Sequence, residues 1–309
     1  MNKVIVILGP TGVGKTGLSL LLAKRLNTEI ISADSMLVYS HMDIGTAKPS
    51  REELDTVPHH LINILSPTES FSAGLFKEMA SLIIDDLHEK NKVPLIAGGT
   101  GLYIRSLTKG LFAGPSADLS MREELKKQEE RHAPGYLYDL LINVDPETAR
   151  SIEPNDRRRI IRALEVSLKE KKKISQIRSN ATIPSAYDFI KIGLTRDRKE
   201  LYRIIEERVD VMMGKGLLKE VKALFEMGPG KTAMQAIGYK ELGLYLNGEV
   251  DMPEAVRLIK KRTKMYAKRQ YTWFNKEPDV TWVDISGINK ADEIYEKVIN
   301  TVAILNKLN

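Results

Sequence analysis

The sequence GPTGVGKT, residues 9–16, stands between an apolar run, KVIVIL, and a helical pattern, TGLSLLLAKRLN. Its glycine, lysine and threonine spacing is that of a P-loop, which requires a strand before it and a helix after it. The glycines let backbone N–H groups surround phosphate oxygens, and the first turn of the helix adds a favourable dipole. Lys15 would place its charge on the terminal phosphate, and the Thr16 hydroxyl can ligate Mg²⁺. The predicted phosphate-binding residues are Gly9, Pro10, Thr11, Gly12, Val13, Gly14, Lys15 and Thr16.

Short apolar segments alternate with helical patterns along most of the chain. This alternation predicts an α/β fold, with a P-loop on a doubly wound parallel sheet. Ligands bind such sheets beyond the carboxyl ends of the strands. Gly9, Asp34 and Thr100 each follow such an end, so we expect three separate segments to meet in one cleft. The expected strands cover residues 3–8, 29–34, 59–65, 92–99, 187–195 and 280–285.

The middle of the chain has a different pattern. Residues 113–186 show helical periodicity and no convincing strand. We therefore predict a helical insertion domain at 113–186, carried by a P-loop α/β core that is formed by residues 1–112 and 187–309.

Composition narrows the class of protein. With 309 residues, 42% of them hydrophobic, the chain is long enough to bury a sizeable core. Cysteine is absent, which excludes disulfides and thiolate metal sites. No apolar run reaches the length of a secretory signal or a membrane span. We expect a cytoplasmic monomer that has no association with a membrane.

The net charge of +6 is concentrated in two basic segments, 157–173 and 257–276, and the second holds eight Lys or Arg and no acid. In a helix over 254–275, Val256 and Ile259 share one face with Thr263 and Tyr266. A face rich in lysine is usually only solvated, but the lack of acids favours contact with a phosphate backbone. The basic face carries Arg257, Lys261, Lys264 and Lys268.

Three polar residues each admit a structural and a functional interpretation. Asp34 is either a turn or cap residue, or a carboxylate base that faces the phosphate site. Thr100 either caps the helix after it or donates a hydrogen bond to a phosphate. Arg208 lies on an apolar stripe of a helix predicted over 199–221. A guanidinium there needs either a structural ion pair or an anionic ligand.

A nucleoside-triphosphate enzyme usually also has an apolar strand that ends in an acid holding Mg²⁺. The segment LIIDD, residues 82–86, looks like such a strand, but it lies inside a helical pattern. We therefore expect Asp85 and Asp86 to be solvated, and the sequence does not identify the usual magnesium acid. The expected cofactor is Mg²⁺ on Thr16, and it stays open whether a nucleoside triphosphate also binds the loop.

Eight motifs occur in order along nearly the whole chain. They are GPTGVGKT, ADSMLVYSHMDIGTAKP, VPHHL, AGGTGLY, EPNDRRRIIRALEV, ERVDVMMGKGLLKEV, QAIGYKE and TKMYAKRQYTWF. In this combination the chain resembles the bacterial tRNA dimethylallyltransferase family, also called tRNA isopentenyltransferase. The resemblance implies transfer of a dimethylallyl group from dimethylallyl diphosphate to N6 of the adenine 3′ of a tRNA anticodon. The central insertion then matches a mobile domain that closes over the anticodon stem.

The resemblance also implies roles for single residues. Asp34 matches the general base, Thr100 a residue in contact with the diphosphate, and Arg208 the arginine that stabilises it. Two positions depart from the family pattern: Met36 stands where small or polar residues are frequent, and Lys240, which lacks bidentate geometry, where arginine is common. The implied tRNA-binding residues are Asp34, Ser35, Met36, Leu37, Thr100, Arg122, Asp156, Arg157, Arg158, Arg159, Ile160, Gln235, Ala236, Ile237, Gly238, Tyr239 and Lys240, to which the basic helix adds Lys261, Lys264 and Lys268.

Other functions fit parts of the same pattern. A P-loop kinase of a small molecule would pair this loop with a doubly wound sheet and a helical lid. A noncatalytic RNA-binding protein would use the loop as a nucleotide sensor. An isopentenyltransferase of free adenine nucleotides is disfavoured by the basic helix and the insertion.

Overall fold

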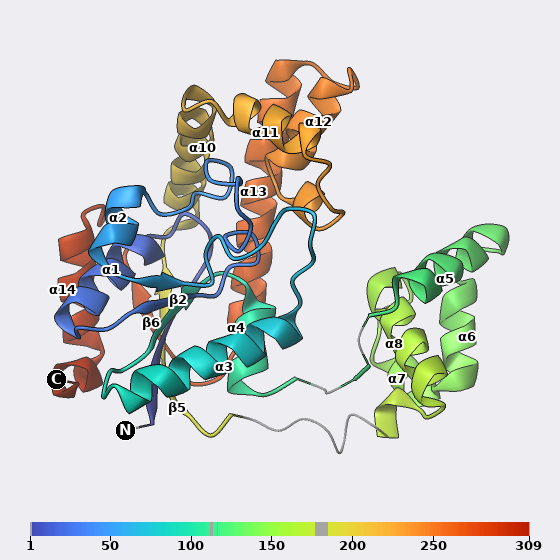
Figure 1. Ribbon diagram of the computed structural model, residues 1–309, viewed down its shortest axis with the longest axis horizontal. Helices are drawn as coiled ribbons and strands as arrows, with labels where there is room; N and C mark the ends of the chain where they lie inside the picture. The colour runs from blue at the N-terminus through green and yellow to red at the C-terminus, as the bar shows by residue number, and fades with distance from the viewer. Residues whose placement is uncertain (1, 112–113, 116, 177–184, 309) are drawn as a thin grey trace. The chain divides into compact units, whose positions relative to one another are not determined.

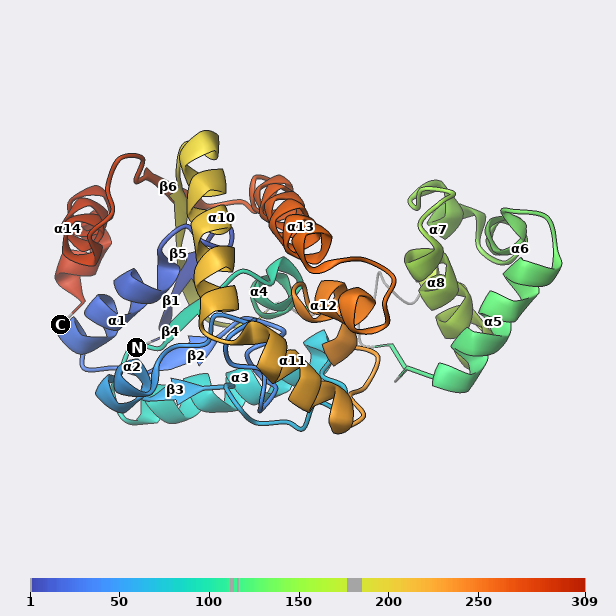
Figure 2. The ribbon, with the colours of Figure 1, turned by 90° about the horizontal axis from the view of Figure 1, so that it is seen from above.

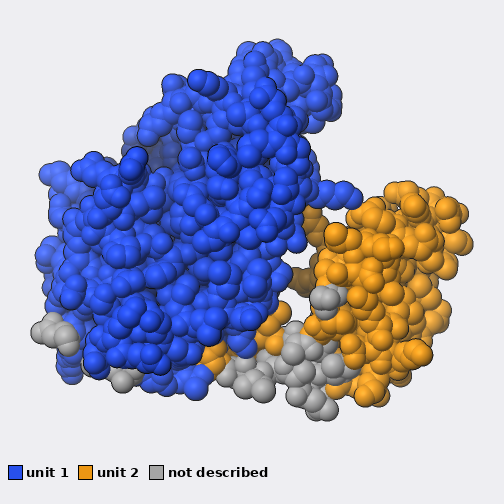
Figure 3. Space-filling view, in the orientation of Figure 1, with its two compact units in different colours: residues 1–108, 186–309 blue, residues 109–185 orange. Residues whose placement is uncertain are grey.

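The structure is a computed structural model that describes residues 2–111, 114–115, 117–176 and 185–308. It divides into two compact units, unit 1 with residues 1–108 and 186–309 and unit 2 with residues 109–185, which Figure 3 colours separately. Within the described ranges, no helix combines the length and the apolar character that crossing a membrane requires.

Unit 1 is built on a sheet of parallel strands with helices around it (Figure 1), and the strand order is β3-β2-β4-β1-β5-β6 (Figure 2). Each strand lies where the sequence predicts one, so the doubly wound parallel sheet is confirmed. Because β2, β4 and β1 are neighbours, the segments that follow them emerge side by side at one edge of the sheet. The strands are β1 (Lys3–Leu8), β2 (Ile30–Ser32), β3 (His59–His60), β4 (Leu95–Gly98), β5 (Asp188–Thr195) and β6 (Val280–Asp284).

Helices cover the sheet of unit 1 and make up most of unit 2. Those of unit 1 are α1 (Lys15–Arg25), α2 (Arg51–Thr56), α3 (Ala73–Glu89), α4 (Gly101–Thr108), α10 (Arg198–Gly214), α11 (Leu217–Glu226), α12 (Tyr239–Leu246), α13 (Met252–Phe274) and α14 (Ala291–Thr301), with short 3₁₀ turns η1 (Ala233–Gln235) and η2 (Ala303–Lys307). Those of unit 2 are α5 (Leu119–Arg131), α6 (Tyr136–Val144), α7 (Pro146–Arg150) and α8 (Arg157–Glu170).

The central strand β1 divides the core of unit 1 into two layers, because successive side chains of a strand point to opposite faces. Val4, Val6 and Leu8 pack with residues of α3 and α4, whereas Ile5 and Ile7 pack with α1 and α14. Figure 2 shows α1 and α14 on one side of the strands and α4 and α13 on the other. Burial on both faces explains why the central strands β1, β2 and β4 have continuous apolar sequences.

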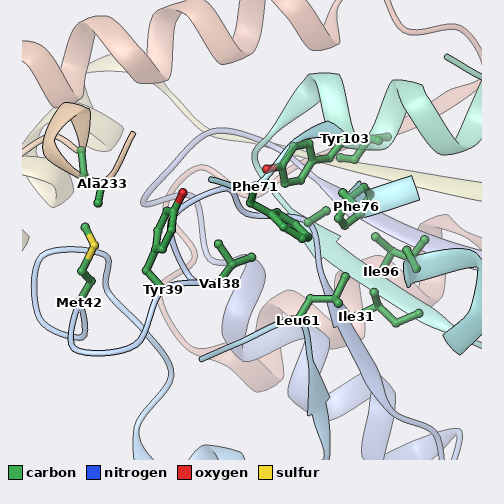
Figure 4. Packing of buried hydrophobic residues seen from close by; sticks show 14 of the residues in the cluster. Ile31, Val38, Tyr39, Met42, Leu61, Phe71, Phe76, Ile96, Tyr103 and Ala233 are labelled. Atoms are coloured by element: carbon green, nitrogen blue, oxygen red, sulfur yellow. The ribbon is translucent and has the colours of Figure 1, made fainter. Parts of the chain in front are cut away.

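The segment after Asp34 is pinned to this core. Val38, Tyr39 and Met42 are fully buried, and Figure 4 shows them in the cluster that also holds Phe71 and Leu61. The backbone is fixed as well, because the N–H groups of residues 64 and 65 both donate to the Val38 carbonyl. The strand end that carries Asp34 therefore continues into a packed segment.

Unit 2 has its own apolar core, formed by side chains of α5, α6 and α8 such as Leu125, Leu141 and Leu164. At its edge the fully buried Glu165 accepts hydrogen bonds from both Arg122 and Arg162. Burial raises the pKa of this carboxyl, but the hydrogen bonds from Arg122, from the Asp118 N–H and from Arg162 outweigh this effect and leave the pKa below its usual value. The acid is therefore ionised and ties α5 to α8.

One prediction about the helices was wrong and another was confirmed. Residues 199–221, predicted as one helix, form α10 and α11, because Gly216 has a φ of 94° and opens α11 in the left-handed region. LIIDD lies in α3 as predicted, and both of its acids are exposed. Asp86 pairs with Lys90 at 2.6 Å, and Asp85 accepts a hydrogen bond from Tyr187.

Candidate active site

The loop after β1 has the backbone of a phosphate cradle. Gly9 has a φ of 149°, and a Cβ there would lie 2.8 Å from the Leu194 carbonyl oxygen. Gly14 has a φ of 114° and caps the start of α1. Only glycine adopts these conformations without strain. The loop residues from Thr11 to Thr16, apart from the buried Val13, line a cavity of about 300 Å³ that we name the phosphate cavity.

Lys15 folds back into the loop. Its Nζ donates to the carbonyl oxygens of Gly9, at 2.9 Å, and Pro10, at 2.8 Å. Burial lowers the pKa of Lys15 to about 8; Asp34 opposes this shift and Arg208 adds to it. The amine is thus a charge held inside the cradle, and a bound anion would favour its protonated form.

Arg208 reaches the P-loop from α10. Its guanidinium donates to the Thr11 Oγ1 at 2.6 Å, whereas its buried Nε has no hydrogen-bond partner among the described residues. Burial lowers the pKa of Arg208, and the nearby Asp34 opposes that shift. Across the described chain, no carboxylate forms an ion pair with this guanidinium. The arrangement therefore supports an anionic ligand rather than a structural ion pair.

Asp34 lies at the carboxyl end of β2 and is held from two sides. Its Oδ1 accepts from the Met36 N–H at 2.9 Å, as in a turn. The Thr100 Oγ1 accepts from the Ser35 N–H at 3.0 Å, and the Thr100 N–H donates to the Ala33 carbonyl. Through these two hydrogen bonds Thr100 fixes the backbone on both sides of Asp34, and its side chain does not cap α4. Its contact with a diphosphate stays a prediction.

A second cavity, of about 260 Å³, adjoins the phosphate cavity. The two cavities share Thr11, Asp34, Thr46 and Arg208 in their walls. The carboxylate and the guanidinium thus stand where the cavities meet. The rest of the second cavity is mostly apolar, with one aromatic ring and one further cation at its wall: Met36, Val209, Met212, Leu217, Ile237, Ile259, Tyr266 and Arg269.

The glycines of AGGTG serve packing within the protein. A Cβ on Gly98 would lie 2.2 Å from the Ala33 carbonyl oxygen, and one on Gly99 would lie 2.3 Å from Nε2 of Gln270. A Cβ on Gly101 would lie 2.2 Å from the Trp273 ring. The loop after β4 therefore lies directly against β2 and against α13.

Glu220 of α11 holds the loop between β2 and α2. Its carboxylate accepts the backbone N–H groups of Asp43, Ile44 and Gly45 at 2.9, 2.8 and 3.0 Å. It also accepts the hydroxyl of the fully buried Tyr239 at 2.6 Å. Because Gly45 and Thr46 line the second cavity, this carboxylate fixes part of its wall.

The structure places the implied tRNA-binding residues in unequal settings. Arg157, Arg158 and Arg159 are exposed in the first turn of α8, which Asp156 caps. In the QAIGYK segment Gln235 and Ile237 line the second cavity, and Lys240 donates to Gln235 at 3.1 Å. The side chains of Ile160, Ala236 and Tyr239 are buried, and their contact with tRNA stays a prediction.

Four of the implied cations have acidic partners within the described part of the chain: Arg122, Arg157, Arg159 and Lys264. Arg157 lies 3.8 Å from Glu129, and Arg159 lies 3.2 Å from Asp156. Arg122 binds the buried Glu165 through two hydrogen bonds, a structural use that its sequence context does not reveal. Lys264 pairs with Glu206 of α10, whereas Lys261 and Lys268 are exposed on α13. The acid-free segment is therefore partly neutralised by a neighbouring helix.

The residues near the P-loop can be tested for a fit to Mg²⁺. Within the described ranges, no group of three or more His, Asp or Glu could hold a metal ion. Thr16 is exposed at the start of α1. The buried hydroxyl of Ser32, which lines the phosphate cavity, has no hydrogen-bond partner among the residues that the structure describes. Mg²⁺ usually takes few protein ligands and completes its shell with substrate phosphates and water. These residues therefore fit a Mg²⁺ held chiefly by a bound diphosphate.

Comparison with known proteins identifies the family. A family model described as IPP transferase matches residues 37–277 of the chain. The chain belongs to the IPP transferase family. The transferase is 52% identical, over 99% of both chains, to a tRNA dimethylallyltransferase of Thermodesulfovibrio yellowstonii. It is 47% identical, again over 99% of both, to one of Carboxydothermus hydrogenoformans.

Solved structures agree with the fold. A tRNA isopentenylpyrophosphate transferase of Bacillus halodurans is 42% identical to the transferase, with a TM-score of 0.72, over 100% of this chain and 99% of that one. A eukaryotic dimethylallyltransferase captured in the act of modifying tRNA is 31% identical, with a TM-score of 0.82, over 99% of this chain and 80% of that one.

Three residues of the site were not predicted from the sequence. Glu220 and Gln270 act through backbone groups, which leave no trace in sequence spacing. Arg269 lines the second cavity and lies 5.8 Å from the centre of the Tyr266 ring. It belongs to the acid-free segment, so the charge pattern could have identified it.

Proposed function

We propose that this chain transfers a dimethylallyl group from dimethylallyl diphosphate to N6 of the adenine 3′ of a tRNA anticodon, releasing diphosphate. The observation that carries the proposal is the pair of adjoining cavities with Asp34 and Arg208 in both walls. One cavity offers amides and a lysine for phosphates, and the other offers an apolar and aromatic lining for a base. The names of its relatives, which are tRNA dimethylallyltransferases, point the same way.

The chemistry requires a base and a group that stabilises the departing anion. The N6 lone pair attacks C1 of the dimethylallyl group, while the C1–O bond breaks and its electron pair leaves with the diphosphate. Asp34 accepts the proton that N6 loses, because the amino group of adenine is a weak nucleophile until that proton departs. Lys15, Arg208 and the loop amides neutralise the charge that develops on the leaving oxygen.

Thr16 would hold Mg²⁺, which when bound supplies further positive charge to the diphosphate. Ser32 would offer its free hydroxyl to the same cavity. Neither residue transfers a proton in this proposal.

The tRNA contacts that we propose use exposed residues. Arg157, Arg158 and Arg159 of unit 2, and Lys261 and Lys268 of α13, present cations to a phosphate backbone. A flexible anticodon loop lets the target base leave its stack at small cost. We propose that the protein works as a monomer in the cytoplasm, where its tRNA substrate is found.

The P-loop kinase is the second candidate. Its usual magnesium acid has no counterpart in LIIDD, whose acids are exposed on α3 and bound to Lys90 and Tyr187. The second cavity, next to the phosphate cavity, is rich in apolar side chains. It therefore suits a prenyl group and a nucleobase better than the polar small molecule that a kinase would phosphorylate.

Incubation of the protein with tRNA and dimethylallyl diphosphate tests the proposal. We expect one anticodon-loop adenosine to gain the mass of a dimethylallyl group, with release of pyrophosphate only when tRNA is present. Formation of ADP from ATP with a small acceptor, and no change in the mass of the tRNA, would establish the kinase instead.

A further inference from the structure

Gln270 of α13 is a buried amide that takes no part in the proposed chemistry. Only 5% of its surface is exposed. Its Oε1 accepts from the Thr11 N–H of the P-loop at 2.9 Å. Its Nε2 donates to the Gly99 carbonyl of the loop after β4, also at 2.9 Å. One side chain from a distant part of the sequence thus joins two loops at the carboxyl edge of the sheet.

The hydrogen bond from Thr11 to Gln270 connects Gln270 to Arg208, the residue proposed to stabilise the leaving diphosphate. Thr11, whose backbone Gln270 holds, accepts the 2.6 Å hydrogen bond from the guanidinium of Arg208 through its Oγ1. Thr11 and Arg208 both line the two cavities. A shift of the Thr11 backbone therefore moves the anchor of the arginine.

The hydrogen bond from Gln270 to Gly99 connects Gln270 to Asp34, the proposed general base. Gly99 precedes Thr100, whose Oγ1 accepts the Ser35 N–H at 3.0 Å and whose N–H donates to the Ala33 carbonyl at 3.1 Å. Ala33 and Ser35 flank Asp34. A shift of the loop after β4 would therefore move the backbone on both sides of Asp34 and change the orientation of its carboxylate.

The amide of Gln270 lies close against the backbone of Gly99. A Cβ on Gly99 would lie 2.3 Å from Nε2 of Gln270, so the glycine is needed for the amide to approach. The two bonds require an acceptor and a donor on one planar group. Glutamate, when ionised, offers only acceptors, and methionine offers only a weak one.

We propose that Gln270 is a positioning residue that sets the separation between Arg208 and Asp34, and with it the geometry of group transfer. This inference rests on the proposed function. Displacement of catalytic groups by about 1 Å can cost on the order of 100-fold in rate. A polar group that is merely satisfied in the core would instead affect stability and leave the rate per folded molecule unchanged.

The first variant, Gln270→Glu, keeps the acceptor for the Thr11 N–H but places a second oxygen against the Gly99 carbonyl, which it repels. The second variant, Gln270→Met, removes both hydrogen bonds. Gly99→Ala is a third variant, because its Cβ would displace an intact amide. Asn275→Asp, an amide-to-acid change at an exposed position just past α13, is the matched control. The measurements are kcat and KM for both substrates, the single-turnover rate, tRNA affinity and the thermal midpoint, all on the full chain.

We expect single-turnover rates reduced by about 10- to 100-fold in all three variants, with KM and tRNA affinity within about twofold of the wild type. Asn275→Asp should keep the wild-type rate. If one variant fails to fold, the other two still decide the matter. Rates within about twofold of the wild type in the folded variants, or losses confined to the thermal midpoint, would overturn the inference. A wild-type protein without prenylation activity would instead overturn the proposed function.

Discussion

Replacing Glu220 by glutamine tests how the wall of the second cavity is held. In the wild type two carboxylate oxygens accept four hydrogen bonds, from the N–H groups of Asp43, Ile44 and Gly45 and from the Tyr239 hydroxyl. Glutamine has one such oxygen, and its NH₂ group would face the remaining two donors. The more buried pair, Gly45 and Tyr239, should keep the oxygen.

The cost follows from what is lost. The Asp43 N–H is exposed and can donate to a water molecule instead. The Ile44 N–H is partly buried and loses its acceptor. Charge-assisted bonds contribute about 1.5–3 kcal/mol each and a buried unsatisfied donor costs about 1–3 kcal/mol, so we expect a loss of about 2–4 kcal/mol in the free energy of unfolding. Because Gly45 and Thr46 line the second cavity, KM for tRNA should also rise.

Urea denaturation followed by tryptophan fluorescence is a suitable assay, because both tryptophans, Trp273 and Trp282, lie in unit 1. Glu226→Gln makes the same change at an exposed position of α11 and should alter stability by less than about 0.5 kcal/mol. A Glu220→Gln loss no larger than that of the control would refute the reasoning.

Two further predictions concern charge. Since the pKa of Lys15 is about 8 and its protonated form binds phosphate, diphosphate affinity should fall by up to about tenfold per pH unit above pH 8. Calorimetric titration should show that Lys15→Arg, which stays charged, removes this slope, and an unchanged slope would contradict it. Lys261→Ala and Lys268→Ala should each lower the salt slope of tRNA binding by about 1, whereas Lys264→Ala, whose lysine is already paired with Glu206, should lower it less. Equal effects in a filter-binding series would show that the ion pair does not matter.

The sheet and the glycine-rich loop after β1 could be predicted because local sequence controls them. The central strands β1, β2 and β4 are apolar runs that are buried on both faces, and the glycines at 9 and 14 are needed for positive φ values. The break between α10 and α11 depends on a single left-handed residue, Gly216, which a continuous apolar stripe concealed.

The site was predicted less completely. Asp34 and Arg208 stand at strand-end and helix-stripe positions that sequence spacing can recognise. The partners of Lys264 and Arg122 come from other helices, so a count of local charges could not find Glu206 or Glu165. The burial of Ile160 and Tyr239 likewise depends on tertiary packing.

In the proposed reaction Asp34 accepts the proton of N6 at the junction of the two cavities. Asp34→Asn keeps an oxygen for the Met36 N–H, so the local backbone should be preserved while the base is lost. In a single-turnover assay with tRNA and dimethylallyl diphosphate, we expect the rate of prenylation to fall by about 100- to 10,000-fold, with tRNA affinity within about twofold of the wild type. A rate within about threefold of the wild type would show that Asp34 is not the base.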